Sequence, residues 1–202
     1  MSHPLRIVVA DDEPDMREYF QKLLPRLGHQ VVGAAQDGRA LLELCRKERP
    51  DLVITDIKMP DMDGIDAAVQ LYRERPLPVI LVSAYHDPDL IARAEADHIL
   101  GYLVKPVKQA DLAPAIALAV RRFEQFQALT AEAADLRQAL EDRKVIEKAK
   151  GVLMKGIGLD EQDAFRRLQK LASGQNRKLV EVARMIVAGE QTSVDPGVRQ
   201  PR

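Results

Sequence analysis

The chain has 202 residues, which is enough for one ordinary domain and a smaller second one. Hydrophobic residues make up 46% of it, and its 30 Lys and Arg nearly balance its 31 Asp and Glu. An aromatic content of 4% without Trp argues against a β-sandwich, and a single Cys excludes an internal disulfide framework and a zinc site built from cysteines. No apolar run approaches the ~20 residues that a membrane span needs, so we expect a cytoplasmic protein without membrane contact.

Short apolar runs alternate with helical patterns over the first half of the chain. Val, Ile and Leu dominate these runs, which are apolar on both faces, as buried parallel strands are. The expected strands are Leu5–Ala10, Gln30–Ala34, Leu52–Thr55, Pro78–Ser83 and Gly101–Val104. The expected helices cover residues 14–27, 38–48, 65–75 and 87–97. Repeated strand–helix units predict an α/β fold with a doubly wound, five-stranded parallel sheet.

A long helix is expected after the fifth strand. It starts near Asp111, and no Gly or Pro occurs from Ala115 to Lys150. Its apolar residues repeat at spacings of three and four, with one three-residue slip. They are Leu112, Ile116, Ala119, Phe123, Phe126, Leu129, Ala133, Leu136 and Leu140. This seam predicts a coiled-coil linker over residues 126–142 that pairs with a second copy of the chain, unless the seam folds back on its own chain.

The segment 143–190 is basic, with 11 Lys and Arg against 6 Asp and Glu, whereas residues 1–126 hold 16 against 20. We expect three short helices here, the first ending near Lys155, the second starting at Asp160 and the third following Asn176. The apolar faces of the second and third comprise Ala164, Phe165, Leu168, Leu171, Ala172, Leu179, Val182, Ala183 and Ile186. So few residues make a marginal core. Residues 191–202 are expected to form a disordered tail.

Charged and polar side chains stand at the carboxyl ends of the predicted strands. Asp11 and Asp12 follow the first strand, Asp56 the third, Ser83 ends the fourth and Lys105 follows the fifth. These ends meet at one edge of a parallel sheet, so the side chains should converge. Three carboxylates in one place repel each other, and Mg²⁺ would relieve that repulsion. With a lysine and a hydroxyl nearby, the set suits phosphoryl transfer to a carboxylate.

Residues 5–125 resemble a two-component receiver domain with a CheY-like, flavodoxin-like fold, and we assign residues 1–125 to it. The matching motifs are V-A-D-D-E from Val9, T-D-I-K-M-P-D-M-D-G from Thr55, V-S-A from Val82 and G-Y-L-V-K-P from Gly101. One departure is the sequence 97–100, which reads Asp-His-Ile-Leu where receivers often have small residues.

The resemblance implies roles for individual residues. Asp56 would be the phosphoacceptor, and a sensor histidine kinase would be the donor. The ligands of Mg²⁺ would be Asp11, Asp12, Asp56 and the backbone carbonyl of Lys58. Ser83 and Tyr102 would form the switch, Lys105 would pair with the phosphoryl group, and the Lys105–Pro106 peptide would be cis.

A stripe of basic residues runs along the first helix of the segment 143–190. At 100° per residue, Lys144, Lys148, Gly151 and Lys155 fall on one side, opposite an apolar face that includes Ala149. Gly151 would let a phosphate backbone or a base approach the helix closely, or else it merely lets a neighbouring helix pack. Further basic residues follow at Arg166, Arg167, Lys170, Arg177 and Lys178.

The same segment resembles an ANTAR domain, an RNA-binding output module of bacterial response regulators. The matching stretches are R-K-V-I-E-K-A-K-G-V-L-M from Arg143, G-L-D-E-Q-D-A-F-R-R-L from Gly158 and N-R-K-L-V-E-V-A from Asn176. The resemblance implies binding of paired stem-loops in nascent transcripts, which prevents terminator formation. The expected RNA-binding residues are Lys144, Lys148, Ala149, Lys150, Gly151, Lys155, Arg166, Arg167, Arg177 and Lys178. With no aromatic residue expected on the basic face, Arg and backbone contacts would replace base stacking.

Together these features predict a phosphorylation-controlled antiterminator that dimerises through the coiled coil and the receiver switch face. Two alternatives remain open. Ala172–Ile186 could be the turn and recognition helix of a DNA-binding response regulator, or the basic stripe could bind an acidic protein. The C-terminal segment has no His or Cys, so we expect no enzyme activity beyond self-phosphorylation and self-dephosphorylation of the receiver.

Overall fold

The computed structural model describes residues 4–84 and 99–193. The chain divides into two compact units, Met1–Ala128 and Leu129–Arg202. The expected helix at 87–97 and the departure from the receiver motif at 97–98 lie outside the described residues.

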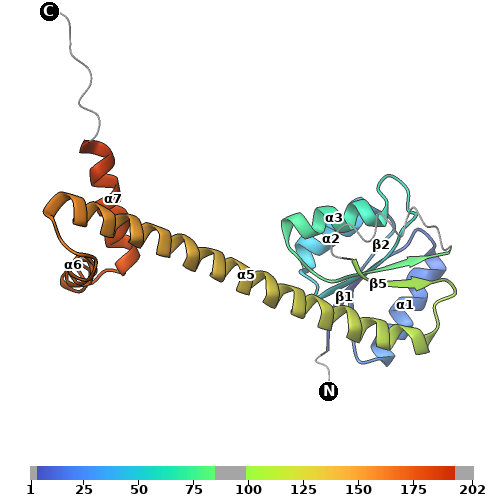
Figure 1. The fold of residues 1–202 in the computed structure, drawn as a ribbon. Coiled ribbons are helices and arrows are strands. Elements are labelled where there is room, and N and C mark those ends of the chain that lie inside the picture. The colour runs from blue at the N-terminus through green and yellow to red at the C-terminus, as the bar shows by residue number, and fades with distance from the viewer. Residues whose placement is uncertain (1–3, 85–98, 194–202) are drawn as a thin grey trace, which may run out of the picture. The chain divides into compact units, whose positions relative to one another are not determined.

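The first unit is built on a parallel sheet (Figure 1). Its strands are β1 (Arg6–Ala10), β2 (Gln30–Ala35), β3 (Leu52–Asp56), β4 (Val79–Ser83) and β5 (Ile99–Val104). Their order, β2-β1-β3-β4-β5, with every neighbouring pair parallel, confirms the predicted doubly wound sheet. β3 and β4 are buried along their whole length, which explains their apolar sequence.

Helices cover both faces of this sheet. Residues of α2 (Gly38–Glu48) and α3 (Gly64–Glu74) form one core cluster with the strands, and residues of α1 (Pro14–Arg26) and α5 (Gln109–Ile157) form another. Two aspartates cap the helices of the first cluster, because Asp37 accepts from the Ala40 amide at 2.8 Å and Asp63 from the Asp66 amide at 2.7 Å.

The lone cysteine, Cys45, lies inside the first cluster as a free thiol. Burial raises its pKa to about 12, with a small opposing effect of Arg75. Such a thiol is almost entirely protonated at neutral pH and is a poor nucleophile. Cys45 is therefore a packing residue of the receiver-like core.

Helix α5 begins in one unit and ends in the other, and its apolar seam changes role along the way. Leu112, Ile116 and Ala119 are buried in the core of the first unit. At these three positions the seam folds back on its own chain, against the sheet, and they lie before the stretch 126–142 that was expected to pair with a second copy. From Ala128 to Glu141 every residue is exposed, and the leucines of this stretch are strongly so. The exposed fractions are 65% for Leu129, 60% for Leu136 and 60% for Leu140.

The second unit consists of the end of α5 with α6 (Glu161–Gly174) and α7 (Leu179–Ser193). Asp160 caps α6, as its position in the sequence suggested, by accepting from the Asp163 amide at 2.7 Å. The core of the unit comprises Ala149, Leu168, Ala172, Val182 and Ala183. Helix α7 runs three residues into the tail expected at 191–202, and residues 194–202 lie outside the described part.

Ion pairs supplement this small core. Lys150 on α5 lies 2.7 Å from Glu161 on α6, and Arg184 on α7 lies 2.9 Å from Asp142 on α5. Each pair joins α5 to another helix.

Among the described helices, none is both long and apolar enough to cross a membrane.

Candidate functional site

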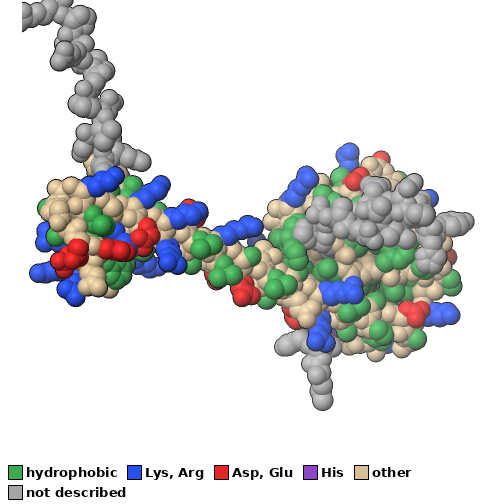
Figure 2. Space-filling model, viewed as in Figure 1, with side chains coloured by type: hydrophobic (Ala, Val, Ile, Leu, Met, Phe, Trp, Pro, Cys, Tyr) green, Lys and Arg blue, Asp and Glu red, His purple; other side chains and the backbone are tan. Residues whose placement is uncertain are grey.

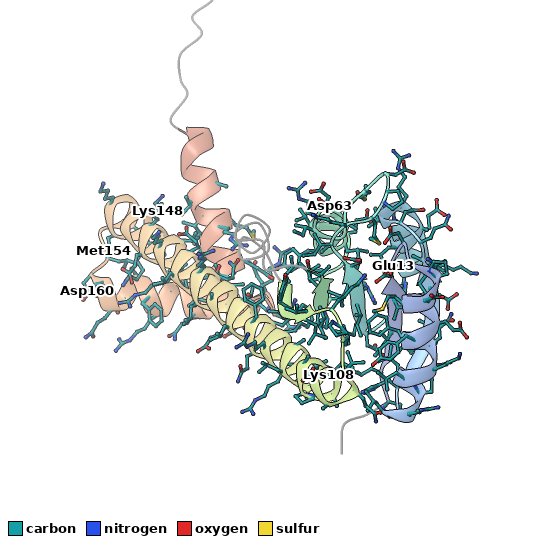
Figure 3. All side chains as sticks on the ribbon, turned by 90° about the vertical axis from the view of Figure 1, so that its right-hand side faces the viewer. Glu13, Asp63, Lys108, Lys148, Met154 and Asp160 are labelled. Atoms are coloured by element: carbon teal, nitrogen blue, oxygen red, sulfur yellow. The ribbon has the colours of Figure 1, made fainter. Side chains whose placement is uncertain are left out.

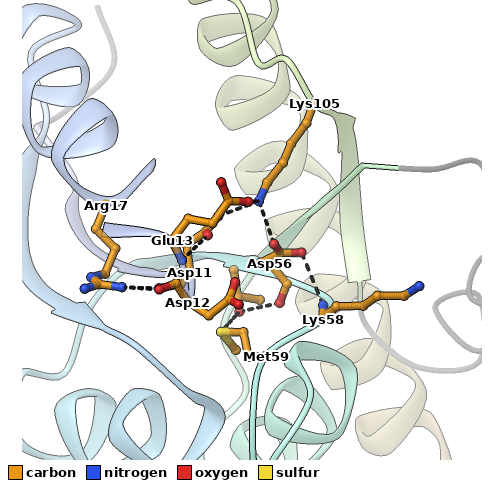
Figure 4. A network of polar contacts seen from close by, with 9 residues as sticks. Asp11, Asp12, Glu13, Arg17, Asp56, Lys58, Met59 and Lys105 are labelled. Carbon is orange, nitrogen blue, oxygen red and sulfur yellow. Dashed lines mark hydrogen bonds and ion pairs between the residues drawn. The ribbon is translucent and has the colours of Figure 1, made fainter. Parts of the chain in front are cut away.

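Four carboxylates gather at the carboxyl edge of the sheet (Figure 4). Asp11, Asp12 and Glu13 follow β1, and Asp56 ends β3, with one oxygen of each within 4.8 Å of the others. Asp11 and Asp56 are buried, whereas Asp12 and Glu13 are exposed. The structure therefore brings together the three aspartates predicted from the sequence and adds Glu13, which the sequence analysis missed.

Lys105, just after β5, supplies the positive charge of this cluster. Its Nζ lies 2.6 Å from Asp56 Oδ2 and 3.0 Å from Glu13 Oε1. Burial lowers the pKa of Lys105, but its close contacts with the carboxylates of Asp56, Asp11 and Glu13 outweigh this effect, and the net pKa is raised. The side chain therefore stays protonated at physiological pH and can balance an anion next to Asp56. The Lys105–Pro106 peptide is cis, as expected.

The donor set of the cluster fits a hard cation. Asp11 Oδ2 is buried and lies 3.0 Å from Lys105 Nζ. Apart from this ion pair, Asp11 Oδ2 has no hydrogen-bond partner among the described residues. Burial also raises the pKa of Asp11, against the opposing effects of Lys105 and the Glu13 amide. This buried carboxylate oxygen has no hydrogen-bond partner besides its ion pair with Lys105, and it lies among three further carboxylates. It is therefore a suitable ligand for Mg²⁺.

The switch residues predicted from the sequence lie near the same edge. Ser83, the last residue of β4, is buried, and Tyr102 on β5 is half-buried. Lys58 donates its backbone amide to Asp56 Oδ1 at 3.2 Å, which holds the loop after β3 against the carboxylate.

Arg17 on α1 anchors the acidic loop and was not singled out by the sequence analysis. Its Nη1 donates to the backbone carbonyls of Asp11 at 2.7 Å and Asp12 at 2.9 Å. One guanidinium nitrogen thus holds two consecutive peptide groups whose side chains belong to the acidic cluster (Figure 4). Groups that hold metal ligands in place typically affect affinity by 10- to 100-fold.

Replacing Arg17 by Ala is expected to weaken Mg²⁺ binding by roughly 10-fold, because both carbonyls lose a charged donor and the loop gains freedom. A calorimetric titration of the unphosphorylated protein with Mg²⁺ measures this directly. Arg26→Ala is the matched control, since Arg26 is an exposed arginine in the last turn of the same helix. Equal affinities in the two variants would remove Arg17 from the site.

Gly64, the first residue of α3, lies directly against the backbone of Asp56. Its amide donates to the Ile57 carbonyl at 2.8 Å. A Cβ at this position would overlap the carbonyl oxygen of Asp56 and come within 2.9 Å of Thr55 Oγ1. The close approach of α3 to the end of β3 therefore requires glycine.

The second unit carries the basic residues predicted to bind RNA, and two of the ten predicted contacts are misplaced. Ala149 is fully buried in the bundle core. Lys150 is 8% exposed and lies between Glu147 at 2.9 Å and Glu161 at 2.7 Å. These two residues therefore hold the bundle together instead of facing a ligand. The helical pattern had already placed Ala149 on the apolar face, and only the family resemblance implied its contact with RNA; the pairing of Lys150 depends on Glu161 of α6, which its own helix does not reveal.

The other eight predicted contacts lie at the surface, where basic side chains surround a smaller group of carboxylates (Figure 2). Lys144 lies 2.6 Å from Glu141, and Arg166 lies 3.5 Å from Asp163. Lys148 and Lys155 form no ion pair within the described residues, and Lys148 is marked in Figure 3. A Cβ on Gly151, between them, would meet nothing within 4 Å among the described residues, so this glycine is not needed for helix packing. The remaining surface residues are Arg167, Arg177 and Lys178.

Comparison with known proteins agrees with this division. Residues 7–117 match the response regulator receiver domain family, and residues 134–187 match the ANTAR domain family. The transcriptional regulatory protein PdtaR of Mycobacterium tuberculosis is 41% identical over 184 residues, which is 91% of this chain and 90% of that protein. The probable transcriptional regulatory protein NarL of the same organism is 38% identical over 123 residues, covering 57% of this chain and 56% of its own.

Solved structures resemble the first unit. The receiver domain of Mycobacterium tuberculosis NarL aligns with a TM-score of 0.55 at 33% identity, covering 59% of this chain and 98% of that domain. A receiver domain protein from Clostridium thermocellum aligns with a TM-score of 0.55 at 31% identity, covering 60% of this chain and 98% of its own.

Proposed function

This chain belongs to the response regulators that join a receiver domain to an ANTAR domain, and on that premise we propose that it is an RNA-binding transcription antiterminator controlled by phosphorylation of Asp56. A sensor histidine kinase is the proposed phosphodonor. The proposed RNA ligand is a pair of stem-loops in a nascent transcript, and its binding keeps a terminator from forming.

The proposed phosphoryl chemistry belongs to the receiver alone. A carboxylate oxygen of Asp56 attacks phosphorus, the bond from phosphorus to the donor breaks, and the donor leaves with that electron pair. Lys105, held 2.6 Å from Asp56, balances the charge of the phosphoryl group. Mg²⁺, held by Asp11, Asp12, Asp56 and the Lys58 carbonyl, would neutralise phosphoryl oxygens when bound. Uptake and loss of this group at Asp56 are the whole proposed reaction.

The main observation in favour of RNA binding is the open space beside Gly151. This glycine lies between Lys148 and Lys155 on the outer face of α5, and the space beside it is open. A nucleic acid backbone can therefore approach the helix backbone while two unpaired ammonium groups contact phosphates. A helix that needed this glycine for packing would show a neighbour there.

The exposed leucines of residues 128–141 support dimerisation through a second copy of the same helix. Leu129, Leu136 and Leu140 keep heptad-like spacing and have 60% or more of their surface exposed. Pairing would bury them in a coiled coil and link two ANTAR domains. Two linked domains bind two stem-loops far more tightly than one domain binds one.

The test of this function is retention of RNA from a pool of native leader transcripts, with and without Mg²⁺ and a small phosphodonor. The proposal predicts enrichment of paired stem-loops that overlap terminators, more strongly with phosphodonor. The control is the Lys148→Ala, Gly151→Leu double variant, which should retain little. Retention of duplex DNA of matched length would favour the DNA-binding alternative, and retention of neither nucleic acid would favour a protein partner.

A milder change separates RNA contact from folding. Gly151→Ala should stabilise the helix by up to about 1 kcal/mol, because Ala is the better helix former and its methyl group meets open space. The same methyl group should weaken RNA binding by about tenfold, because a loss of about 1.4 kcal/mol of binding free energy lowers the affinity tenfold. Thermal unfolding and filter binding measure the two effects. Gly156→Ala, at another open glycine of α5, should leave affinity unchanged; a tighter complex with Gly151→Ala would contradict the proposed contact.

A further inference from the structure

Phe165 is the one aromatic residue from Leu129 to the end of the sequence, and it is not fully packed. Its exposed fraction is 37%, whereas Ala164 before it and Leu168 one turn later are fully buried. The core cluster of the second unit does not include it. Phe165 was expected on the apolar face that its helix buries, but the ring lies at the border between core and solvent and is not part of the core.

The residues around Phe165 on α6 are polar. Helical spacing places Glu161 and Gln162 one turn before it and Gln169 one turn after it, and all three are exposed. Glu161 is fixed by its ion pair with Lys150, so the first turn of α6 is held against α5. Phe165, one turn further along the same helix, is thus bordered by two amides and a carboxylate.

This combination suits a base better than a phosphate. A carboxylate next to the ring repels phosphate but leaves a neutral base unaffected, and amide side chains can donate to and accept from the edge of a base. Proteins that read unpaired RNA stack its bases on aromatic rings. Lysines such as Lys148, on the same bundle, would hold the phosphate backbone.

We propose that Phe165 stacks on an unpaired loop base of the bound RNA and that Gln162 and Gln169 contact the edge of that base. This inference rests on the RNA-binding function proposed above, and it replaces the expectation that no aromatic residue takes part. The ring supplies the flat apolar surface, and the ion pair one turn before it joins its helix to α5.

The absence of Trp from the sequence offers a direct test. Phe165→Trp places a single Trp at the stacking position. The probe is a synthetic RNA with two hairpins and unpaired loops, compared with a fully paired RNA duplex of the same length. We expect the hairpin RNA to quench the Trp fluorescence and the duplex not to. The Trp variant should keep the affinity of the wild type, while Phe165→Ala should lose roughly tenfold.

Two further variants separate stacking from packing. Phe165→Leu keeps an apolar side chain but removes the aromatic face, so its affinity should fall although its circular dichroism and unfolding midpoint stay near those of the wild type. Met154→Ala, at a residue of 38% exposure on α5 (Figure 3), is the matched control and should bind normally. Wild-type affinity in Phe165→Leu, an equal loss in Met154→Ala, or an unquenched Trp would overturn the stacking role. Failure of the wild type to bind hairpin RNA would instead overturn the proposed function itself.

Discussion

An Asp56→Asn variant is expected to acquire no phosphoryl group from a small acyl phosphate in the presence of Mg²⁺, whereas the wild type acquires one. The amide has the shape of the carboxylate but lacks the anionic oxygen that attacks phosphorus. Asp56 is also the carboxylate closest to Lys105, at 2.6 Å, and its Oδ1 accepts the Lys58 amide, so that it stands where charge on a phosphoryl group would be balanced. Intact-protein mass spectrometry measures the gain.

The control is Asp135→Asn, which removes an exposed carboxylate of α5 and should be phosphorylated like the wild type. The same pair of variants tests the link to the second unit. Phosphodonor should increase RNA affinity and dimerisation in the wild type and in Asp135→Asn, but not in Asp56→Asn. A phosphoryl group found on Asp56→Asn would mean that another residue is the acceptor. A response to donor without phosphorylation would separate RNA binding from Asp56.

Gly64→Ala is expected to be the most damaging small substitution in the first unit. The new methyl group would overlap the carbonyl oxygen of Asp56, so that α3 or the end of β3 must move. Overpacking at a rigid backbone contact costs about 3 kcal/mol. Because the displaced group is the backbone of the phosphoacceptor, phosphorylation should fall together with stability. Urea unfolding followed by circular dichroism measures the loss.

Gly33→Ala is the matched control for this prediction. A Cβ at Gly33 would come within 3.1 Å of the Leu44 side chain, whose methyl groups can rotate away. We expect a loss below about 1 kcal/mol and normal phosphorylation. Gly64→Ala with the stability of the wild type would show that α3 is free to shift and that the close approach has no role in the site.

The sheet and the aspartate cluster were predictable because their signals are local. Buried parallel strands have a characteristic run of Val, Ile and Leu, and the carboxyl ends of such strands meet at one edge, which places Asp11 near Asp56 although 45 positions separate them. Asp160 was likewise expected at the start of a helix, because a side chain that caps a helix acts on its own backbone.

What was missed depends on directions in space that a spacing pattern does not contain. Glu13 belongs to the site because the fold brings it to Lys105, 92 positions further along the chain, and Arg17 because its guanidinium reaches back to the carbonyls of Asp11 and Asp12. Periodicity also cannot say which of several elements covers an apolar face. The same spacing buries Ile116 against a sheet and leaves Leu136 exposed. Phe165 lies at the border of such a face, where the spacing pattern of one helix does not determine whether a side chain is buried or exposed.

The exposed stretch from Ala128 to Glu141 has an evolutionary consequence. None of its side chains belongs to the core of either unit, so recombination within it would break no packing on either side. Only helix-forming sequence and the leucine spacing would have to be preserved. A gene segment that ends in this stretch therefore encodes a receiver half that can be joined to a different output half without redesign of either core.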